Sequence, residues 1–468
     1  MSNEAPRTGD QLVALEEVSG GTYEPTVVAR SLERLGNSLG WSSGESAFGR
    51  VIPDGARVLL KPNWVLHENQ GPWGMEPLVT HPTLVKAAAE AALRTGAGQV
   101  TVGDAPVQGC DFDRLMAAGG YREWAERLQA SDSRFAGLRD FRRTKSVVHE
   151  WHRETTREQR SIDNFVLFDL AGDSLLEPIT VDGAFRVTMY DPKMMKRTHA
   201  PGRHQFLVAR EILEADVVIN LPKLKTHKKA GITCALKNLI GINGNKEFLP
   251  HHRIGGAEAG GDCYPGRSPI KRTLEFVYDL QNSTDDQTAQ RAYSLATRAL
   301  NRAARMAGDR LGVEGSWSGN DTIWRTCLDL NRILLYGRPD GTIADERQRR
   351  VLNVVDAVVA GQGDGPLNAE PFPLGFLVGG SSSAAIDWVG AMLLGYAPER
   401  IPITAHAFDR FRWPLTDFEP SDVRVAGSLG EGPSSLVAGS GLPTPSNHPL
   451  GWLDAVVTPG AAEATTAR

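Results

Sequence analysis

The stretch Asn220-Leu-Pro-Lys-Leu-Lys-Thr-His-Lys-Lys-Ala-Gly-Ile-Thr-Cys-Ala-Leu-Lys-Asn-Leu-Ile-Gly241 follows directly on an apolar, strand-like run, Asp216–Asn220 (DVVIN). Three other strand-like runs also end in a polar or acidic residue followed closely by proline or glycine, namely those that end at Asn63, Asp104 and Asp356. In a parallel sheet the carboxyl ends of the strands lie along one edge, where ligands bind in open α/β folds. A local turn explains any one of these residues, but four together predict a shared cleft.

Strand-like runs and helix-like segments alternate along the chain. The run Arg57–Lys61 is followed by a predicted helix over Pro82–Thr95 and then by the run Gln99–Gly103. The alternation returns later, where Val351–Val355 is strand-like and a helix is predicted from about Ser383. Such alternation is typical of βαβ units. The sequence therefore predicts an α/β fold with a mainly parallel sheet flanked by helices.

The predicted domain organisation is a core with two distinct ends. We expect a flexible N-terminus at residues 1–10, an α/β catalytic core at 11–431, and a tail rich in proline, serine and glycine at 432–468. Part of the tail is expected to be held to the body by three side chains, Leu450, Trp452 and Leu453.

Two largely helical insertions are predicted to interrupt the core, at about 107–165 and 255–340. The second includes an arginine-bearing amphipathic helix near Ala289–Leu311. Insertions of this size on an α/β core often form lids or oligomer contacts. The sequence therefore leaves a homo-oligomer open.

Composition limits the class of protein. The chain has 468 residues, of which 41% are hydrophobic and 23% are charged, as in globular proteins. Its four cysteines lie far apart with no C-x-x-C pair, which excludes a ferredoxin module and a cysteine-rich zinc site and fits a reducing compartment. No apolar run is long enough for a membrane span, and the N-terminal residues lack an export signal. We expect a cytoplasmic protein with no iron–sulfur cluster and no membrane partner.

A basic island lies within an otherwise acidic chain. Between Lys193 and Arg253 there are twelve Lys or Arg residues against four Asp or Glu, whereas the whole chain has 51 against 56. Within the island, Lys228 and Lys229 fit a solvated loop. Lysines near other cations tend to have a lowered pKa, which suits an anion clamp, a base or a Schiff-base former. Four residues embedded in apolar sequence are expected to meet a ligand: Lys223, Lys225, His227 and Lys237.

The candidate site residues fall into three groups. Those predicted to be catalytic are His227, Lys237, Lys225 and Asp104, with Asp104 orienting His227 or holding a metal. Those predicted to bind the substrate are Lys61, Asn63, His81, Asn220, Lys223 and Asn238. The cofactor is left open. A divalent metal, if one is bound, is assigned to His251, His252 and Asp356, although the histidine spacing matches no standard motif.

Several of these motifs are also those of a known family. The chain resembles the family catalogued as domain of unknown function 362 at Lys61-Pro-Asn63, Thr80-His-Pro82, Val102-Gly-Asp104, 220–227 and 235–241, and its second half at 356–366 and Ala385-Ile-Asp387. The resemblance covers most of residues 55–400 and implies the fold more than a reaction. Many members carry ferredoxin-type cysteine clusters or an export signal, and this chain has neither motif.

A fainter similarity is to the cofactor-binding domain of lactate-racemase-like enzymes. It rests on the order Lys-x-His, a glycine four residues after the histidine and a lysine ten residues after it. In those enzymes a lysine carries a nickel-pincer nucleotide. The resemblance implies that His227 is an acid/base, that Lys237 anchors the cofactor, and that His251 or His252 is a metal ligand. The glycines expected just before that lysine are alanine and leucine in this chain.

Together these features predict an enzyme of specialised metabolism that acts on a small anionic substrate, a carboxylate or a phosphate. Lysine and histidine acid–base chemistry, with or without a metal, suits isomerisation, elimination or decarboxylation, so the expected class is a lyase or an isomerase. Two alternatives stay open: a non-catalytic protein that binds an anion or a nucleic acid, and a metal-delivery or scaffold protein. Nucleic acid is the less favoured partner because the acidic remainder of the chain repels a long polyanion.

Overall fold

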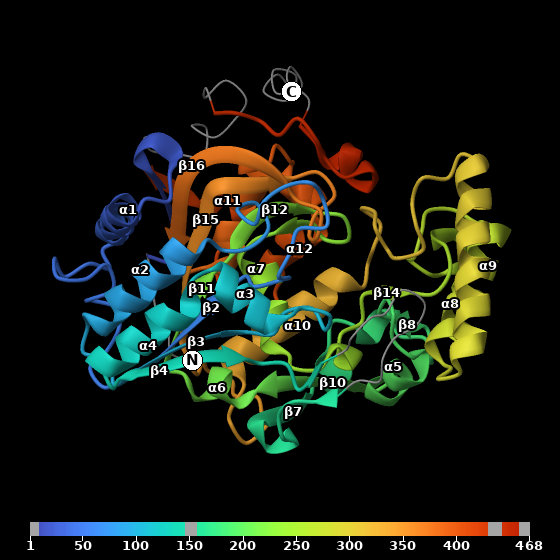
Figure 1. Ribbon diagram of the computed structural model, residues 1–468, viewed down its shortest axis with the longest axis horizontal. Coiled ribbons are helices and arrows are strands. Elements are labelled where there is room, and N and C mark those ends of the chain that lie inside the picture. The colour runs from blue at the N-terminus through green and yellow to red at the C-terminus, as the bar shows by residue number, and fades with distance from the viewer. Residues whose placement is uncertain (1–8, 146–156, 429–441, 458–468) are drawn as a thin grey trace.

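The computed structural model of the chain describes residues 9–145, 157–428 and 442–457. Within them a ten-stranded sheet forms the centre of the molecule (Figure 1). Its strands run in the order β17-β1-β16-β15-β11-β2-β3-β4, with β12 paired to β15 and β13 paired to β12. Their bounds are β1 Leu12–Glu17, β2 Arg57–Pro62, β3 Gln99–Asp104, β4 Phe135–Asp140, β11 Val217–Leu221, β12 Lys223–His227, β13 Gly231–Thr233, β15 Arg350–Gln362, β16 Glu370–Gly380 and β17 Arg424–Gly427.

Most neighbouring strands in this sheet are parallel. The strands β15, β11, β2, β3 and β4 form a parallel block, and β12 also runs parallel to β15. β16 pairs antiparallel with β15 and β1, whereas β17 is parallel to β1. β2, β3 and β11 are buried along almost their whole length, as expected when helices cover both faces of a parallel sheet. The predicted α/β fold with a mainly parallel sheet is therefore confirmed.

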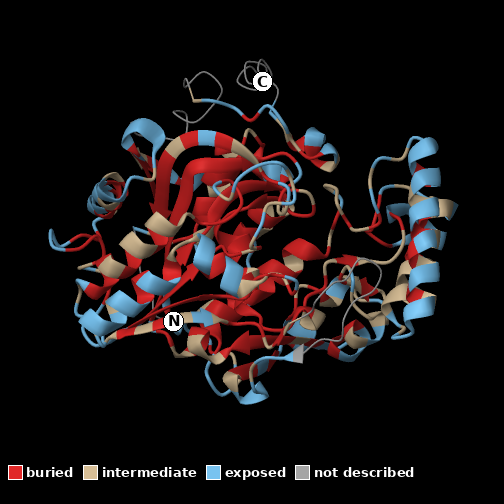
Figure 2. Cartoon of the chain, viewed as in Figure 1, coloured by how far each residue is buried: buried red, intermediate tan, exposed pale blue. Residues whose placement is uncertain are grey.

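Helices cover both faces of the sheet, and Figure 2 shows the buried layer between them. Because side chains alternate along a strand, Val58 and Leu60 of β2 pack into one core and Leu59 faces another. The first core contains α1 (Pro25–Ser38), α2 (Pro82–Leu93) and α4 (Tyr121–Ser131). The opposite side contains α7 (Ala235–Asn238), α10 (Ile323–Tyr336), α11 (Ser383–Leu393) and α12 (Pro402–Ala405).

Both segments predicted as helical insertions also contribute to the core. The first carries α3 (Phe112–Ala118) and α4, and it supplies β4, which extends the sheet beside β3. In the second, α8 (Pro269–Asn282) and α9 (Gln287–Met306) form a hairpin at one side of the molecule (Figure 1), whereas α10 is buried. No helix in the described ranges, the 20-residue α9 included, is long and apolar enough to cross a bilayer.

Smaller sheets pack beside the main one. β10 (Arg203–Ala209) lies between β7 (Phe165–Asp169) and β9 (His199–Ala200). β14 (His252–Arg253) pairs with β8 (Phe185–Arg186), and this pairing includes His252, the second of the two histidines predicted as metal ligands. Short helices α5 (Pro192–Thr198) and α6 (Arg210–Glu214) flank β10.

Part of the C-terminal tail packs against the body. Trp452 is buried, and its Nε1 donates a hydrogen bond to the Lys228 carbonyl (2.8 Å). Leu450 and Leu453 are exposed, so Trp452 alone among the three predicted anchors is buried. The other residues predicted to form flexible ends, 1–8, 432–441 and 458–468, lie outside the described residues.

Candidate active site

Three of the four predicted strand ends meet in one buried polar network. Lys61, at the end of β2, forms an ion pair with Asp104 at the end of β3 (Nζ–Oδ1 2.6 Å) and donates to Asn238 Oδ1 (3.1 Å). Asn63 donates to the same amide oxygen (3.0 Å), and Asn238 in turn donates to Asn220 Oδ1 (2.8 Å). The short helix α7, which carries Asn238, thus joins the ends of β2, β3 and β11.

Asp104 is held by groups other than a histidine. Besides pairing with Lys61, its carboxylate accepts from the backbone N–H of Trp64 (2.7 Å). No hydrogen bond joins it to His227 in the part of the chain that the structure describes. The expectation that Asp104 orients His227 is corrected: it supplies the counter-charge that the buried Lys61 ammonium needs.

The fourth strand end, Asp356 on β15, belongs to a separate buried pair. Its carboxylate lies 2.8 Å from Lys223 Nζ, and both side chains are fully buried. It also accepts from the Tyr23 hydroxyl (2.7 Å) and from the backbone N–H of His81 (2.8 Å). The His81 ring stacks on Tyr23 and caps α2 by accepting from the Thr83 N–H (3.2 Å). Lys223 and His81, both predicted to bind substrate, are therefore engaged within the fold.

The three residues assigned to a metal have different surroundings in the structure. Asp356 is committed to Lys223, whereas His251 precedes β14 and His252 begins it. Across residues 9–145, 157–428 and 442–457, no group of three or more His, Cys, Asp or Glu side chains is arranged to hold a metal ion. Asp356 at the strand end and the pair His251 and His252 thus do not form one set of metal ligands among the described residues.

Two further lysines of the basic island hold loops together. Lys225 Nζ donates to the carbonyl of Leu78 (2.5 Å) and to that of Pro366 (3.4 Å). Burial lowers the pKa of Lys225 well below its ordinary value. Lys229, predicted to be solvated, is buried and donates to the Thr188 hydroxyl (2.8 Å). Lys225 thus connects two loops through two of the three N–H donors of its ammonium.

Lys237 is the one buried lysine in the described residues without a partner. It lies on α7, is 8% exposed, and its Nζ makes no hydrogen bond or ion pair there. Burial lowers the pKa of Lys237. Nearby, Lys246 Nζ donates only to the carbonyl of Ala105 (3.2 Å). Burial lowers the pKa of Lys246 to about 7, and the charges of Lys237 and Lys61 add to this effect against the opposing charge of Asp104.

Two buried histidines present opposite protonation patterns. His227 Nδ1 accepts from the backbone N–H groups of Lys229 (3.0 Å) and Ala230 (3.2 Å), which assigns the proton of the neutral ring to Nε2. His251 Nδ1 donates to the Leu249 carbonyl (2.6 Å), which leaves a lone pair on its Nε2. Burial lowers the pKa of both rings well below 6.5, and Lys237 adds to the effect in each. Near pH 7 both are neutral, one a proton donor and the other an acceptor.

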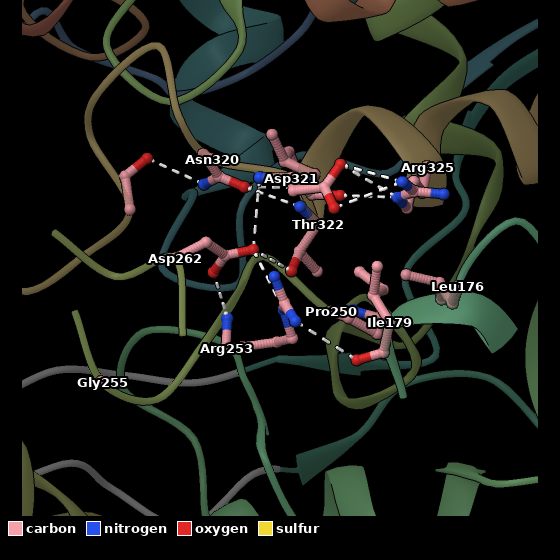
Figure 3. A network of polar contacts seen from close by, with 12 residues as sticks. Leu176, Ile179, Pro250, Arg253, Gly255, Asp262, Asn320, Asp321, Thr322 and Arg325 are labelled. Atoms are coloured by element: carbon pink, nitrogen blue, oxygen red, sulfur yellow. Dashed lines mark hydrogen bonds and ion pairs between the residues drawn. The ribbon is translucent and has the colours of Figure 1, made fainter. Parts of the chain in front are cut away.

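A polar network ties the chain around His251 to α10 (Figure 3). Asn320 donates to the His251 carbonyl (2.9 Å). The Asp262 carboxylate accepts from the backbone N–H of Arg253 (2.5 Å) and from the Thr322 hydroxyl (2.6 Å), just before α10 begins. The segment that carries His251 is therefore attached to a buried helix, which fixes the position of its ring.

Sequence reasoning misses two residues of this region. Lys246 could have been found, because it lies within the basic island of residues 193–253. Tyr23 has no local signal, because its contact with Asp356 joins residues 333 positions apart. From the predicted set, the structure joins Lys61, Asn63, Asp104, Asn220 and Asn238 in one hydrogen-bonded network, and Lys237 lies on the same short helix as Asn238. It places Lys223, Lys225, His81 and Asp356 in structural contacts.

Gly241→Ala is expected to destabilise the protein by about 1–3 kcal/mol, the usual cost of overpacking a filled core. A Cβ on Gly241 would lie 2.1 Å from Asp104 Oδ1 and 2.7 Å from Lys61 Nζ, and neither buried partner has room to retreat. Urea unfolding measures the change. Gly109→Ala, where a Cβ meets nothing within 4 Å, is the matched control. Equal midpoints for the two variants would contradict the packing described for Lys61 and Asp104.

Similar proteins were found at the level of family, sequence and structure. The family described as Domain of unknown function (DUF362) matches residues 58–164 and 173–392. A thylakoid-associated protein of Synechocystis is 22% identical over 384 residues, which are 82% of this chain and 75% of that protein.

Two solved structures also match. One is a protein of Thermotoga maritima, with 10% identity and a TM-score of 0.29. The match covers 77% of this chain and 56% of that one. The other is the lactate racemase apoprotein of Thermoanaerobacterium thermosaccharolyticum, with 12% identity and a TM-score of 0.32. Here the match covers 84% of this chain and 60% of that one. The chain thus spans less than two thirds of each solved chain.

Proposed function

The chain belongs to the DUF362 family, and we propose that it is an enzyme acting on a small anionic substrate, a carboxylate or a phosphate. One observation carries the proposal: the Lys237 side chain is buried, and its ammonium, which keeps a small contact with solvent, makes no hydrogen bond or ion pair among the described residues. Removing most of the water around a cation without supplying a counter-charge disfavours its charged form. A bound anion reverses that effect, because it supplies the missing charge. Lys246, whose Nζ reaches only a carbonyl, is the second group for the same anion.

The two neutral histidines supply proton transfer. His251 Nε2 takes a proton from the carbon next to a carbonyl of the substrate, and His227 Nε2–H gives one to the developing oxyanion or to the carbon. Lys237 stabilises the negative charge that forms, as a preorganised cation does best where water is excluded. This chemistry suits isomerisation, elimination or decarboxylation, so the proposed class is an isomerase or a lyase.

A metal or a covalent cofactor would use the same residues. His251 Nε2 and the buried His252 Nδ1, which has no partner, are free nitrogen donors, but the described residues supply no third ligand beside them. The donor set therefore does not fit a metal held by protein alone, and the proton transfers above involve none. Lys237 fits the anchor that the likeness to lactate-racemase-like enzymes implies. A mass retained on Lys237 when the denatured protein is weighed would identify such an adduct.

Burial of lysines in the basic island favours a small ligand over a nucleic acid. Five lysines of the island are buried, namely Lys223, Lys225, Lys229, Lys237 and Lys246, whereas others, such as Lys193, Lys196 and Arg203, are exposed. A polyanion contacts its partner through exposed cations, and the five lysines around the strand ends are not available to it. We place the enzyme in specialised metabolism of the cytoplasm, where the four free cysteines would stay reduced.

Solvent deuterium exchange tests the proposal. Small carboxylates and phosphate esters are incubated with the protein in D₂O, and exchange of the C–H next to the carbonyl is followed by NMR. Wild type is expected to exchange at least one compound. Lys237→Met should slow that exchange by roughly 100-fold or more, because it removes both the anion partner and the charge that stabilises the carbanion.

Lys228→Met is the matched control for the exchange experiment. Lys228 lies on the same segment, but its side chain is 39% exposed and pairs with Glu314 (3.1 Å). The Lys228→Met variant should therefore catalyse deuterium exchange at the wild-type rate. Full activity of the Lys237 variant, or exchange lost equally in both variants, would overturn the role given to Lys237.

A further inference from the structure

The α8–α9 hairpin carries a surface that the proposed function does not use. The hairpin stands at one side of the molecule (Figure 1), and most of α9 is exposed (Figure 2). On its inner side α9 packs against α8, where Leu300 joins a small core around Leu274 and Val313. The outer side of α9 has no neighbour among the described residues.

The outer side of α9 is a single stripe of arginine and apolar residues. The stripe begins at the exposed Arg291. It continues with four further exposed residues, which follow Arg291 by 4, 11, 14 and 15 positions: Leu295, Arg302, Arg305 and Met306. At 100° per residue these positions fall on one face of the helix. The helix contains no aspartate or glutamate. None of these three arginines forms an ion pair within the part of the chain that the structure describes.

Large apolar side chains are exposed among these cations. Leu295 is 59% exposed and Met306 81%, and Phe276 on α8 is 61% exposed, one turn after the exposed Arg272. Apolar surface on a convex, protruding hairpin has no groove around it to receive a partner's side chain. Exposed arginines are attracted to anionic lipid headgroups near the surface, and apolar side chains exposed between them gain by entering the boundary between headgroups and acyl chains.

We infer that the α8–α9 hairpin binds the surface of an anionic membrane. The arginines pair with lipid phosphates, and Leu295 and Met306, on the same face of α9, enter the boundary between headgroups and acyl chains. The earlier expectation of no membrane partner rested on the lack of a spanning segment, and a helix lying at the surface needs none. The inference does not depend on the proposed enzymatic activity.

The same observations argue against two other occupants. A nucleic acid would pair with the arginines, but its phosphates and sugars would leave the apolar side chains without a favourable contact. A second copy of the chain would bring two faces rich in arginine together in a symmetric contact, and like charges repel.

Vesicle flotation of the full chain tests the inference. The probes are phosphatidylcholine vesicles with and without phosphatidylglycerol. The protein should float with the anionic vesicles alone, and salt should release it because surface charges are screened. The double variant Arg302→Glu and Arg305→Glu should weaken the partition coefficient by roughly 30-fold or more. Leu295→Asp should weaken it without changing its dependence on salt.

Charge-matched variants separate lipid binding from net charge and from misfolding. The control carries Arg50→Glu and Arg338→Glu, two exposed arginines outside the hairpin, and it should float like wild type. Unchanged thermal unfolding shows that the hairpin variants are folded. Equal loss in the control, no flotation of wild type at low salt, or unchanged binding by Leu295→Asp would overturn the inference. Displacement from vesicles by single-stranded DNA at the same phosphate concentration would assign the surface to nucleic acid instead.

Discussion

Asp356→Ala is expected to destabilise the protein by about 3–5 kcal/mol, the usual cost of removing one partner from a buried ion pair. Lys223 and Asp356 lie 2.8 Å apart and both are fully buried. Without the carboxylate, the Lys223 ammonium keeps only the Tyr23 hydroxyl (2.9 Å). The backbone N–H of His81 also loses its acceptor.

Urea unfolding followed by circular dichroism measures this effect. The double variant Lys223→Met and Asp356→Leu should recover part of the lost stability, because it removes both charges together. Asp364→Ala, an exposed carboxylate of the loop that follows β15, should leave the midpoint unchanged. A loss in Asp356→Ala no larger than in the Asp364 variant would mean that the pair is not buried as described.

Acid is expected to unfold the protein steeply below about pH 6.5. Burial lowers the pKa of His227, His251 and His252 well below 6.5 in the folded state, whereas in the unfolded chain they take up protons near that pH. The unfolded state thus binds more protons as the pH falls, and the free energy of unfolding drops. Asp387 opposes this, because burial raises its pKa to about 7 and it takes up a proton on folding.

Burial also lowers the pKa of further histidines, which adds to the loss caused by these three rings: His81, His199, His204 and His448. Lys246, with its pKa lowered to about 7, is largely protonated in both states below that pH and adds little. Each ring that stays neutral in the folded state costs about 1.4 kcal/mol per pH unit once the unfolded chain is protonated.

The pH dependence is checked by urea midpoints between about pH 7 and pH 5.5. His252→Gln should reduce the slope of the free energy of unfolding against pH by the contribution of one proton. It removes one of the rings that become protonated on unfolding. His406→Gln is the control, because the His406 side chain is 44% exposed. A stability that does not fall across this range would show that the three rings are not buried and neutral.

The meeting of the strand ends could be predicted because it depends on one topological rule. Lys61, Asp104 and Asn220 each close an apolar run, and strand alternation with helices makes the sheet parallel. Parallel strands bring their carboxyl ends to one edge whatever their loops contain. The structure brings these residues into one hydrogen-bonded network with Asn238.

The roles of individual lysines could not be predicted in the same way. Lys223, Lys225 and Lys237 share an apolar sequence context, yet the first pairs with Asp356, the second with backbone carbonyls and the third with nothing. An ion pair forms between segments that are distant along the chain, and residue order does not reveal it. For the same reason residue order did not reveal that Asp356, assigned to a metal from the sequence, pairs with Lys223.

The sequence by itself determined the α/β fold, the basic island and the family, because these depend on the order of apolar and charged residues along the chain. Only the tertiary structure determined that Lys237 is the buried lysine without a counter-charge and that His227 and His251 expose opposite nitrogens. Burial, counter-charge and tautomer are properties of contacts between segments, and they exist only once the sheet edge has been assembled.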